Sequence, residues 1–313
     1  MIYTVTLNPA IDKTIQIGHF EKGALNRVEH CLTNLGGKGI NVSFALKALG
    51  AESVALGLAG GETGKKIIQG LKDAHIENHF LETGKETRTN IKIMEKDGTL
   101  TELNEAGAEV SKDLAEAFFD LIKTHINAED ILVLSGSVPG GIPATIYRDL
   151  TRLAHEKGAG VILDADGELF AYGVEACPEV VKPNEEELRR YRMNRQHKEP
   201  EQMQKQVQYL LDKGIKQVIL SRGEKGACFF EAGLEEFWNC PALPVEVRST
   251  VGAGDTMVAA WAYSMCNVLS WQEAVRLSMA ASAAAVTTPG TMSPSIEVVR
   301  SLEDKVRLNV EKF

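Results

Sequence analysis

The chain lacks the cysteine pattern of a disulfide-rich or zinc-binding protein. Its five cysteines are odd in number and widely spaced, and no Cys-x-x-Cys pair occurs. Secreted disulfide frameworks usually hold an even number of cysteines, and structural zinc sites usually hold such close pairs. We therefore expect reduced thiols and a cytoplasmic location.

The chain also lacks long apolar runs and an excess of positive charge. The longest apolar runs, such as residues 257–265 and 279–286, are too short to cross a bilayer. Lys and Arg number 34 against 43 Asp and Glu, which gives a formal net charge of −9. This balance argues against nucleic acids and anionic membranes as partners. An anionic ligand would need a local basic pocket.

Two common nucleotide-binding motifs are absent as well. Neither 35–42 nor 60–66 fits the Walker A pattern G-x-x-x-x-G-K-[ST], and no G-x-G-x-x-G follows an N-terminal strand. The sequence thus disfavours a P-loop NTPase and a dinucleotide-binding dehydrogenase. No low-complexity linker divides the 313 residues, so we expect a single domain over residues 1–313.

Short runs rich in β-branched residues alternate with helical patterns. Apolar residues recur at three-and-four spacing in segments such as 42–49, 114–122 and 207–211, which predicts helices. Strands alternating with helices predict an α/β fold with a doubly wound, mostly parallel sheet, whose ligands bind beyond the carboxyl ends of the strands. From residue 254 onward the pattern predicts helices at 255–265, 271–286 and 295–309. The predicted buried strands are 2–7, 53–58, 131–135, 160–164, 180–182 and 217–221.

Two regions do not fit this alternation of buried strands and helices. Polar and apolar side chains alternate in residues 14–20 and 26–32, and again in residues 88–95 and 99–104. Between the last two segments, Lys96-Asp97-Gly98 is a hairpin turn signal. These segments predict a small half-exposed sheet inserted at about 13–34 and 87–105. Such a sheet would be a lid over the site or an edge that pairs with another subunit, so we expect a homodimer through this lid.

Glycine-rich and polar segments follow the predicted strands. Thr250–Thr256, TVGAGDT, opens a helix whose free amide groups would hold an anion. Asp255 in that first turn either complements only the helix dipole or accepts a hydroxyl proton during phosphoryl transfer. The other segments are LNPAID (7–12), GGKGINV (36–42), SGSVPGG (135–141), KPNEEEL (182–188) and LSRGEKGA (220–227). Each of these segments alone also fits an ordinary turn or helix start.

Taken together and in this order, the segments resemble those of the ribokinase-like (PfkB) carbohydrate kinases, from Met1 to about Val286. LNPAID, the strand 87–93 and the run 101–105 are similar to the hexose-phosphate branch, which includes 1-phosphofructokinases and tagatose-6-phosphate kinases. Asn90 and Lys92 are closer to the former group. One departure is Asp166, a carboxylate where relatives often carry a hydroxyl or amide residue.

The resemblance implies ATP-dependent phosphorylation of fructose 1-phosphate at its 6-hydroxyl, with tagatose 6-phosphate as the alternative substrate. Both sugars present a free terminal hydroxymethyl group away from the phosphate, so the basic residues alone cannot choose between them. A non-catalytic sugar-phosphate sensor would not need the base at Asp255. A kinase for an unphosphorylated sugar would not need Lys38 and Arg88.

The resemblance also implies a role for each matching residue. Asp255 would be the catalytic base, and Gly252, Ala253, Gly254 and Lys38 would complete the catalytic group. Asp12, Gly37, Asn41 and Asn90 would bind the sugar, while Lys38, Arg27 and Arg88, with Ser137 nearby, would bind its existing phosphate. The ATP side would be lined by Lys182, Asn184, Ser221, Gly223 and Gly226, together with Gly252 and Gly254. Asn184 and Glu187 would organise Mg²⁺, through water.

Overall fold

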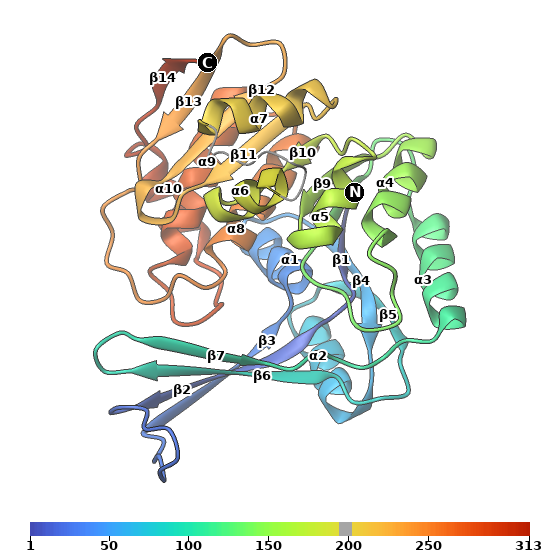
Figure 1. Ribbon diagram of the computed structural model, residues 1–313, viewed down its shortest axis with the longest axis vertical. Coiled ribbons are helices and arrows are strands. Elements are labelled where there is room, and N and C mark those ends of the chain that lie inside the picture. The colour runs from blue at the N-terminus through green and yellow to red at the C-terminus, as the bar shows by residue number, and fades with distance from the viewer. Residues whose placement is uncertain (194–201) are drawn as a thin grey trace.

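Two β-sheets organise the protein. The structure, a computed structural model, describes residues 1–193 and 202–313 (Figure 1). Within these residues, ten strands form the large sheet and four form the small one. The large sheet has the order β14 (Asn309–Lys312), β13 (Glu236–Cys240), β12 (Ala227–Glu231), β11 (Gln217–Ser221), β10 (Val180–Val181), β9 (Gly160–Asp164), β8 (Ile131–Ser135), β1 (Ile2–Thr6), β4 (Ser53–Ala59) and β5 (Glu77–Glu82).

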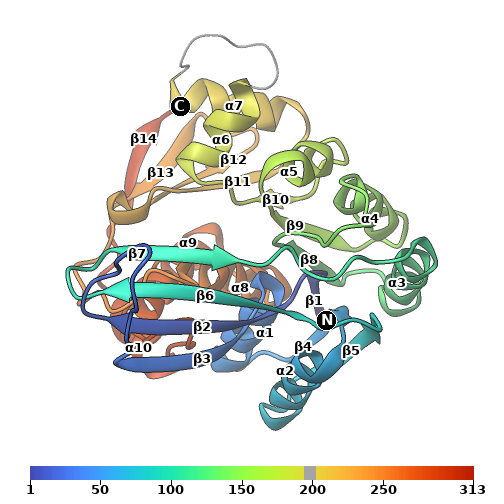
Figure 2. The ribbon, with the colours of Figure 1, turned by 60° about the horizontal axis from the view of Figure 1, so that its bottom comes forward.

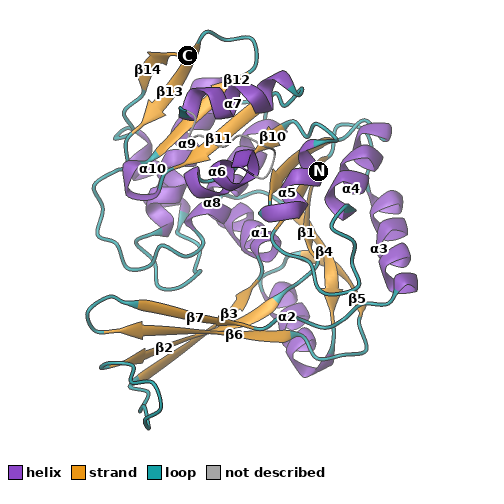
Figure 3. Cartoon of the chain, in the orientation of Figure 1, coloured by secondary structure: helices purple, strands orange, loops and turns teal. Residues whose placement is uncertain are grey.

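The large sheet is parallel from β5 to β11 and antiparallel from β11 to β14. Helices cover both of its faces, as Figure 3 shows. One core lies under α1 (Lys38–Ala48), α8 (Ala253–Cys266), α9 (Trp271–Ala285) and α10 (Ile296–Glu303). The other lies under α3 (Lys112–His125), α4 (Ile146–Glu156), α5 (Gly167–Val174), α6 (Glu185–Met193) and α7 (Met203–Asp212). The predicted doubly wound α/β fold is confirmed.

Alternating side chains along the strands fill both cores. In β1, Tyr3 and Val5 enter the core under α3 and α4, whereas Ile2 enters the core under α1 and α8. Such strands are apolar on both faces, which is why they appear in the sequence as continuous β-branched runs. A smaller cluster joins α2 (Gly61–Asp73) to α1 and β4.

The small sheet projects from the carboxyl edge of the large one (Figure 2). Its order is β3 (His30–Gly36), β2 (Ala10–Ile17), β6 (Arg88–Glu95) and β7 (Leu100–Asn104). The insertion is where the sequence predicts it, but the first pair of strands is displaced: β2 begins at Ala10, directly after Pro9, and residues 18–29 form a loop. Pairing of Ala10 with Arg88 and of Asp12 with Asn90 sets this register, which local alternation could not reveal.

The C-terminal prediction is partly wrong. The expected helix over 295–309 ends at Glu303, and Asn309–Lys312 forms the edge strand β14 against β13. All four residues of β14 are exposed, so no alternating apolar pattern marked them as a strand. None of the helices in residues 1–193 and 202–313 combines the length and the apolar character that crossing a membrane requires.

Candidate active site

The carboxyl ends of the parallel strands open into a pocket of about 720 Å³ beneath the small sheet. The small sheet contributes residues of β2, β6 and β7 to the wall: Asp12, Arg88, Asn90, Lys92, Glu102 and Asn104. Most other lining residues come from the large sheet, its helices and the loops between them. The pocket is lined by most of the predicted site residues: Asp12, Gly37, Lys38, Asn41, Arg88, Asn90, Ser137, Lys182, Asn184, Glu187, Ser221, Gly252, Gly254 and Asp255.

Asp255 lies in the first turn of α8 and lines this pocket. Gly252, the residue before the helix, has a left-handed backbone (φ 84°), which turns the chain so that the first amide groups of α8 are free. Asp255 is 7% exposed, and Asn41 donates a hydrogen bond from Nδ2 to its Oδ2 at 2.7 Å. Burial raises the pKa of Asp255 to about 6, against the attraction of Lys38. A carboxylate with this pKa is ionised at pH 7 and still basic enough to accept a proton.

Two lysines stand beside this helix start. Lys38 Nζ and Lys182 Nζ each lie 3.2 Å from Oδ1 of Asp164, which is 1% exposed. Burial alone would lower the pKa of Lys38, but the carboxylates of Asp164, Asp255 and Glu187 outweigh burial and raise it. Burial alone would raise the pKa of Asp164, but Lys182 and Lys38 lower it. The pocket therefore holds two fixed ammonium groups next to the free amides of α8.

The structure gives Lys38 and Lys182 a common partner that the resemblance did not imply. Lys38, which the resemblance places in the catalytic group and at the sugar's phosphate, pairs with Asp164. Lys182, which the resemblance places on the nucleotide side, also pairs with Asp164 and lines the pocket that holds Asp255. The sequence analysis did not include Asp164 among the site residues. The available signal was its position at the end of β9, where the doubly wound fold places ligand-facing groups.

Arg88, Asn8 and Ser137 also line the pocket. Arg88 donates to the carbonyl oxygens of Glu105 (2.8 Å) and Asn8 (3.1 Å). Its Nε is buried and has no hydrogen-bond partner among the described residues. Asn8 Nδ2 donates to Ser137 Oγ at 3.3 Å, which links the ends of β1 and β8. Burial lowers the pKa of Arg88, as expected for a cation held out of water without a direct anionic partner.

The small sheet presents a buried ion pair to the pocket. Lys92 Nζ and Asn90 Nδ2 each donate to Asp12, at 2.9 Å to separate carboxylate oxygens. Asp12 and Lys92 are both 7% exposed, and Asn90 faces Asp12 across the β2–β6 pair. The carboxylate is therefore held in one orientation, as a group that binds sugar hydroxyls must be.

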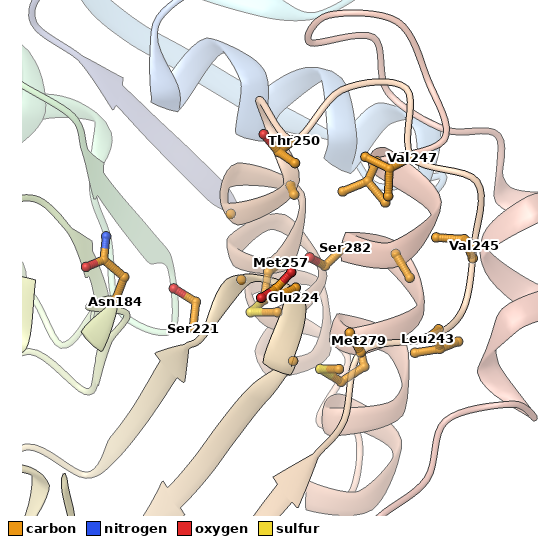
Figure 4. Close-up of a pocket in the computed structure, with 17 residues that line it drawn as sticks. Asn184, Ser221, Glu224, Leu243, Val245, Val247, Thr250, Met257, Met279 and Ser282 are labelled. Atoms are coloured by element: carbon orange, nitrogen blue, oxygen red, sulfur yellow. The ribbon is translucent and has the colours of Figure 1, made fainter. Parts of the chain in front are cut away.

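A second, more apolar pocket of about 410 Å³ adjoins the first (Figure 4). Asn184, Ser221 and Gly254 line both pockets, so the two spaces meet at the start of α8. Figure 4 shows Asn184 and Ser221 on one side and Leu243, Val245 and Met279 on the other. Gly223, Gly226 and Ala253 line the same space. The predicted nucleotide residues, apart from Lys182 and Gly252, therefore lie together here.

Asn184 and Glu187 form a reciprocal cap at the start of α6. Asn184 N–H donates to Glu187 Oε2, and Glu187 N–H donates to Asn184 Oδ1, both at 2.8 Å. Burial raises the pKa of Glu187. This carboxylate therefore has a structural role in the helix as well as a place in the pocket wall.

Arg27 is the one predicted site residue that lies in neither pocket. It is exposed in the loop 18–29 between β2 and β3. Asp166 lines the larger pocket, caps α5 and pairs with Arg190 at 3.1 Å.

Comparisons with known proteins agree with this geometry. Residues 5–298 match the model of the pfkB family of carbohydrate kinases. A 1-phosphofructokinase of Bacillus subtilis (strain 168) is 34% identical over 284 residues, which cover 91% of this chain and 92% of the relative. The crystal structure of phosphofructokinase-2 from Escherichia coli in complex with potassium has a TM-score of 0.89 and 30% identity, over 97% of this chain and 98% of that chain. A possible 1-phosphofructokinase from Thermotoga maritima has a TM-score of 0.85 and 29% identity, over 100% and 99% of the two chains.

Proposed function

This chain belongs to the pfkB family of carbohydrate kinases, and on that premise we propose that it transfers the γ-phosphoryl group of ATP to the 6-hydroxyl of fructose 1-phosphate. The products are fructose 1,6-bisphosphate and ADP. The observation that carries the proposal is a single pocket lined by both the buried carboxylate of Asp255 and the cationic side chain of Arg88. The similarity to a 1-phosphofructokinase of Bacillus subtilis supports this choice of hexose phosphate.

Asp255 acts as the general base in this proposal. Its carboxylate takes the proton of the 6-hydroxyl as the hydroxyl oxygen bonds to the γ-phosphorus, and the bond to the β,γ-bridging oxygen breaks, leaving the electron pair on ADP. Negative charge on the transferred group faces the free amides of α8 and the ammonium groups of Lys38 and Lys182. Asn41 holds the carboxylate in place through its 2.7 Å hydrogen bond.

The phosphate that the sugar already carries is assigned to Arg88, with Asn8 and Ser137. The buried, unpartnered Nε of Arg88 supports this assignment, because an N–H group left in that state is costly unless an anion accepts from it. Asp12 and Asn90 bind sugar hydroxyls in the same pocket. Lys92 joins this group because it fixes Asp12.

ATP is assigned to the apolar pocket, with the base between Leu243, Val245 and Met279 and the triphosphate directed toward Gly254. Glu187 fits a hydrated Mg²⁺ beside those phosphates, since Oε2 caps α6 and Oε1 has no hydrogen bond within the described residues. No group of three His, Cys, Asp or Glu side chains able to hold a metal occurs in residues 1–193 and 202–313. The phosphates and water would therefore supply most ligands to Mg²⁺, which neutralises their charge when bound.

A homodimer through the small sheet is part of the proposal. Leu25 and Val28 in the loop between β2 and β3 are 79% and 51% exposed, Leu103 on β7 is 53% exposed, and a second copy would bury them. Arg27 lies in the same exposed loop as Leu25, so its predicted contact with a phosphate requires a partner subunit or movement of that loop. A cytoplasmic location is also proposed, in keeping with five free cysteines.

The test is ADP release from ATP with each of four acceptors: fructose 1-phosphate, tagatose 6-phosphate, fructose 6-phosphate and free fructose. We expect the highest kcat/KM for fructose 1-phosphate. A higher value for tagatose 6-phosphate or fructose 6-phosphate would replace the substrate and keep the reaction. ADP release equal in all four assays and in the absence of sugar would refute sugar phosphorylation.

A further inference from the structure

Asp164 is a buried carboxylate to which the proposed reaction assigns no step. It ends β9 and is 1% exposed. Oδ1 lies 3.2 Å from both Lys38 Nζ and Lys182 Nζ, while Oδ2 is buried and accepts no hydrogen bond from the described residues. Burying a charge is costly unless it is paired, and here both cations are paired with one oxygen.

The two lysines reach Asp164 from different elements. Lys38 is the first residue of α1, and Lys182 follows β10. Lys182 also lies against the first turn of α8, since a Cβ atom added at Gly254 would be only 3.2 Å from its Nζ. The carboxylate of Asp164 therefore ties two separate chain segments to the place where α8 offers its free amides.

Few other charged groups act on this cluster. Asp255 from α8 and Glu187 from α6 both act on Lys38. The Tyr147 hydroxyl is directed to the carbonyl oxygens of Ser135 and Gly136, at 3.0 and 3.1 Å. The carboxylates within reach of the two ammonium groups are thus Asp164, Asp255 and Glu187, and only Asp164 binds both.

We propose that Asp164 is a positioning residue for phosphoryl transfer, which fixes both ammonium groups over the first turn of α8 and keeps them from pairing with Asp255. This inference rests on the proposed phosphoryl transfer but not on which hexose phosphate is used. The developing charge needs cations that are already in place, because misplacing a group by about 1 Å can cost about a hundredfold in rate. The base, however, must not be neutralised by those same cations.

The proposal predicts two changes in Asp164→Asn. The released lysines lose their fixed position, so kcat should fall by roughly 10–100-fold. The released lysines also approach Asp255 while a neighbouring negative charge disappears, and both effects lower the pKa of Asp255 from about 6. The acid limb of the profile of kcat against pH should therefore move down by about one pH unit, since an opposite charge within contact distance typically shifts a carboxyl by one to three units.

Glu179 offers a matched control. It also contacts two basic side chains, His155 at 3.2 Å and Lys216 at 3.4 Å, and it accepts the Val161 N–H at 2.8 Å. It precedes β10, at the amino end of the strands, away from the pocket that Asp164 lines. Glu179→Gln should lower stability, but kcat and the acid limb should match those of the wild type.

The experiment measures kcat and KM from pH 5 to 8.5 for the wild type, Asp164→Asn and Glu179→Gln, with saturating ATP and the hexose phosphate that the wild type uses best. A reduced kcat together with a shifted acid limb supports the proposal, because loss of folded protein alone would lower kcat at every pH. A kcat within about twofold of the wild type, or a lowered kcat with an unmoved limb, overturns it.

A second variant keeps the test decisive if Asp164→Asn does not fold. Asp164→Glu keeps the charge and displaces it by one methylene, so kcat should fall while the acid limb stays in place. Wild-type kcat in Asp164→Glu would overturn the proposal. All variants are assayed with the acceptor that the wild type uses best. A wild type that prefers another sugar phosphate would therefore refute the proposed substrate but would not contradict the role of Asp164.

Discussion

Replacing Asp255, the proposed catalytic base, should make the protein more stable. Asp255 is 7% exposed, and burial raises its pKa from an ordinary value of 3.8 to about 6. The folded state therefore binds a proton more tightly than the unfolded state, and ionising Asp255 at neutral pH costs stability. A shift of about two units corresponds to about 3 kcal/mol at 1.36 kcal/mol per unit. Asp255→Asn removes that cost, because its amide can still accept the hydrogen bond from Asn41.

The sign and the pH window of this effect are fixed by the raised pKa. The cost is complete above about pH 6, shrinks as the pH falls, and disappears below 3.8, where the carboxyl is protonated in both states. The gain in Asp255→Asn should therefore be up to about 3 kcal/mol at pH 7.5 and about half of that at pH 5. The variant should meanwhile lose turnover by at least about a hundredfold.

The assay is urea unfolding of ligand-free protein at both pH values, followed by the fluorescence of Trp261, which is 1% exposed on the same helix. Asp164→Asn is the matched contrast, because its lowered pKa means that ionised Asp164 stabilises the fold. That variant should lose the same stability at pH 7.5 and at pH 5, because the contribution of ionised Asp164 declines only below its ordinary pKa of 3.8. The reasoning is refuted if Asp255→Asn is no more stable than the wild type at pH 7.5, or if its gain is the same at pH 5.

Four further outcomes test the site. In the wild type, kcat should fall about tenfold per pH unit below about pH 6, where Asp255 becomes protonated, and a flat profile would exclude it as the base. Glu187→Gln should raise the Mg²⁺ concentration for half-maximal activity several-fold, whereas Glu186→Gln, at an exposed position, should not. If Glu187→Gln needs no more Mg²⁺ than the wild type, Glu187 serves only as a helix cap. Arg88→Ala should raise KM for the sugar phosphate by roughly 10–100-fold with little change in kcat, and the reverse pattern would place Arg88 at the transition state. Light scattering at micromolar concentration should give a dimer, and Leu103→Lys should weaken it; a wild-type monomer would refute the dimer.

Much of the pocket lining was predictable because its residues lie in short segments beside strand ends and helix starts. Asp12, Asn184 and Asp255 belong to short segments next to β1, β10 and α8, so their position in the fold follows from the position of those elements. A parallel sheet brings the carboxyl ends of its strands to one edge. Sequence order was therefore enough to predict which residues would meet.

The partners of each residue were not predictable in the same way. Lys38 and Asp164 are 126 positions apart, and their pairing depends on how α1 packs beside β9. Motif resemblance assigned Lys38 in part to the sugar's phosphate, since a lysine near a helix start fits any anion. Asp164 carried no motif signal, because a single carboxylate after a buried strand also fits a turn.

Two further strands of the large sheet escaped prediction. β12 lies between β11 and β13 and follows the turn 223–226, whose glycines mark a hairpin but not the length of the strand beyond it. The edge strand β14 exposes every side chain and is held by backbone pairing with β13 and by one side-chain hydrogen bond, from Asn239 to Glu311. Hydrophobic periodicity reports burial, so a strand that buries nothing leaves no pattern in the sequence.

The two carboxylates at the site show how one set of lysines serves two needs. Both are buried, yet the pKa of Asp255 is raised by burial while that of Asp164 is lowered by Lys182 and Lys38. Phosphoryl transfer needs cations close to the reacting oxygens, whereas a base paired with a cation accepts a proton poorly. In the proposed mechanism, binding the lysines to Asp164 meets both requirements. Their charge still faces the amides of α8, while Asp255 keeps a pKa close to the pH at which it must accept a proton. The expected loss of stability from ionised Asp255 is thus the consequence of binding the lysines to Asp164 instead of to Asp255.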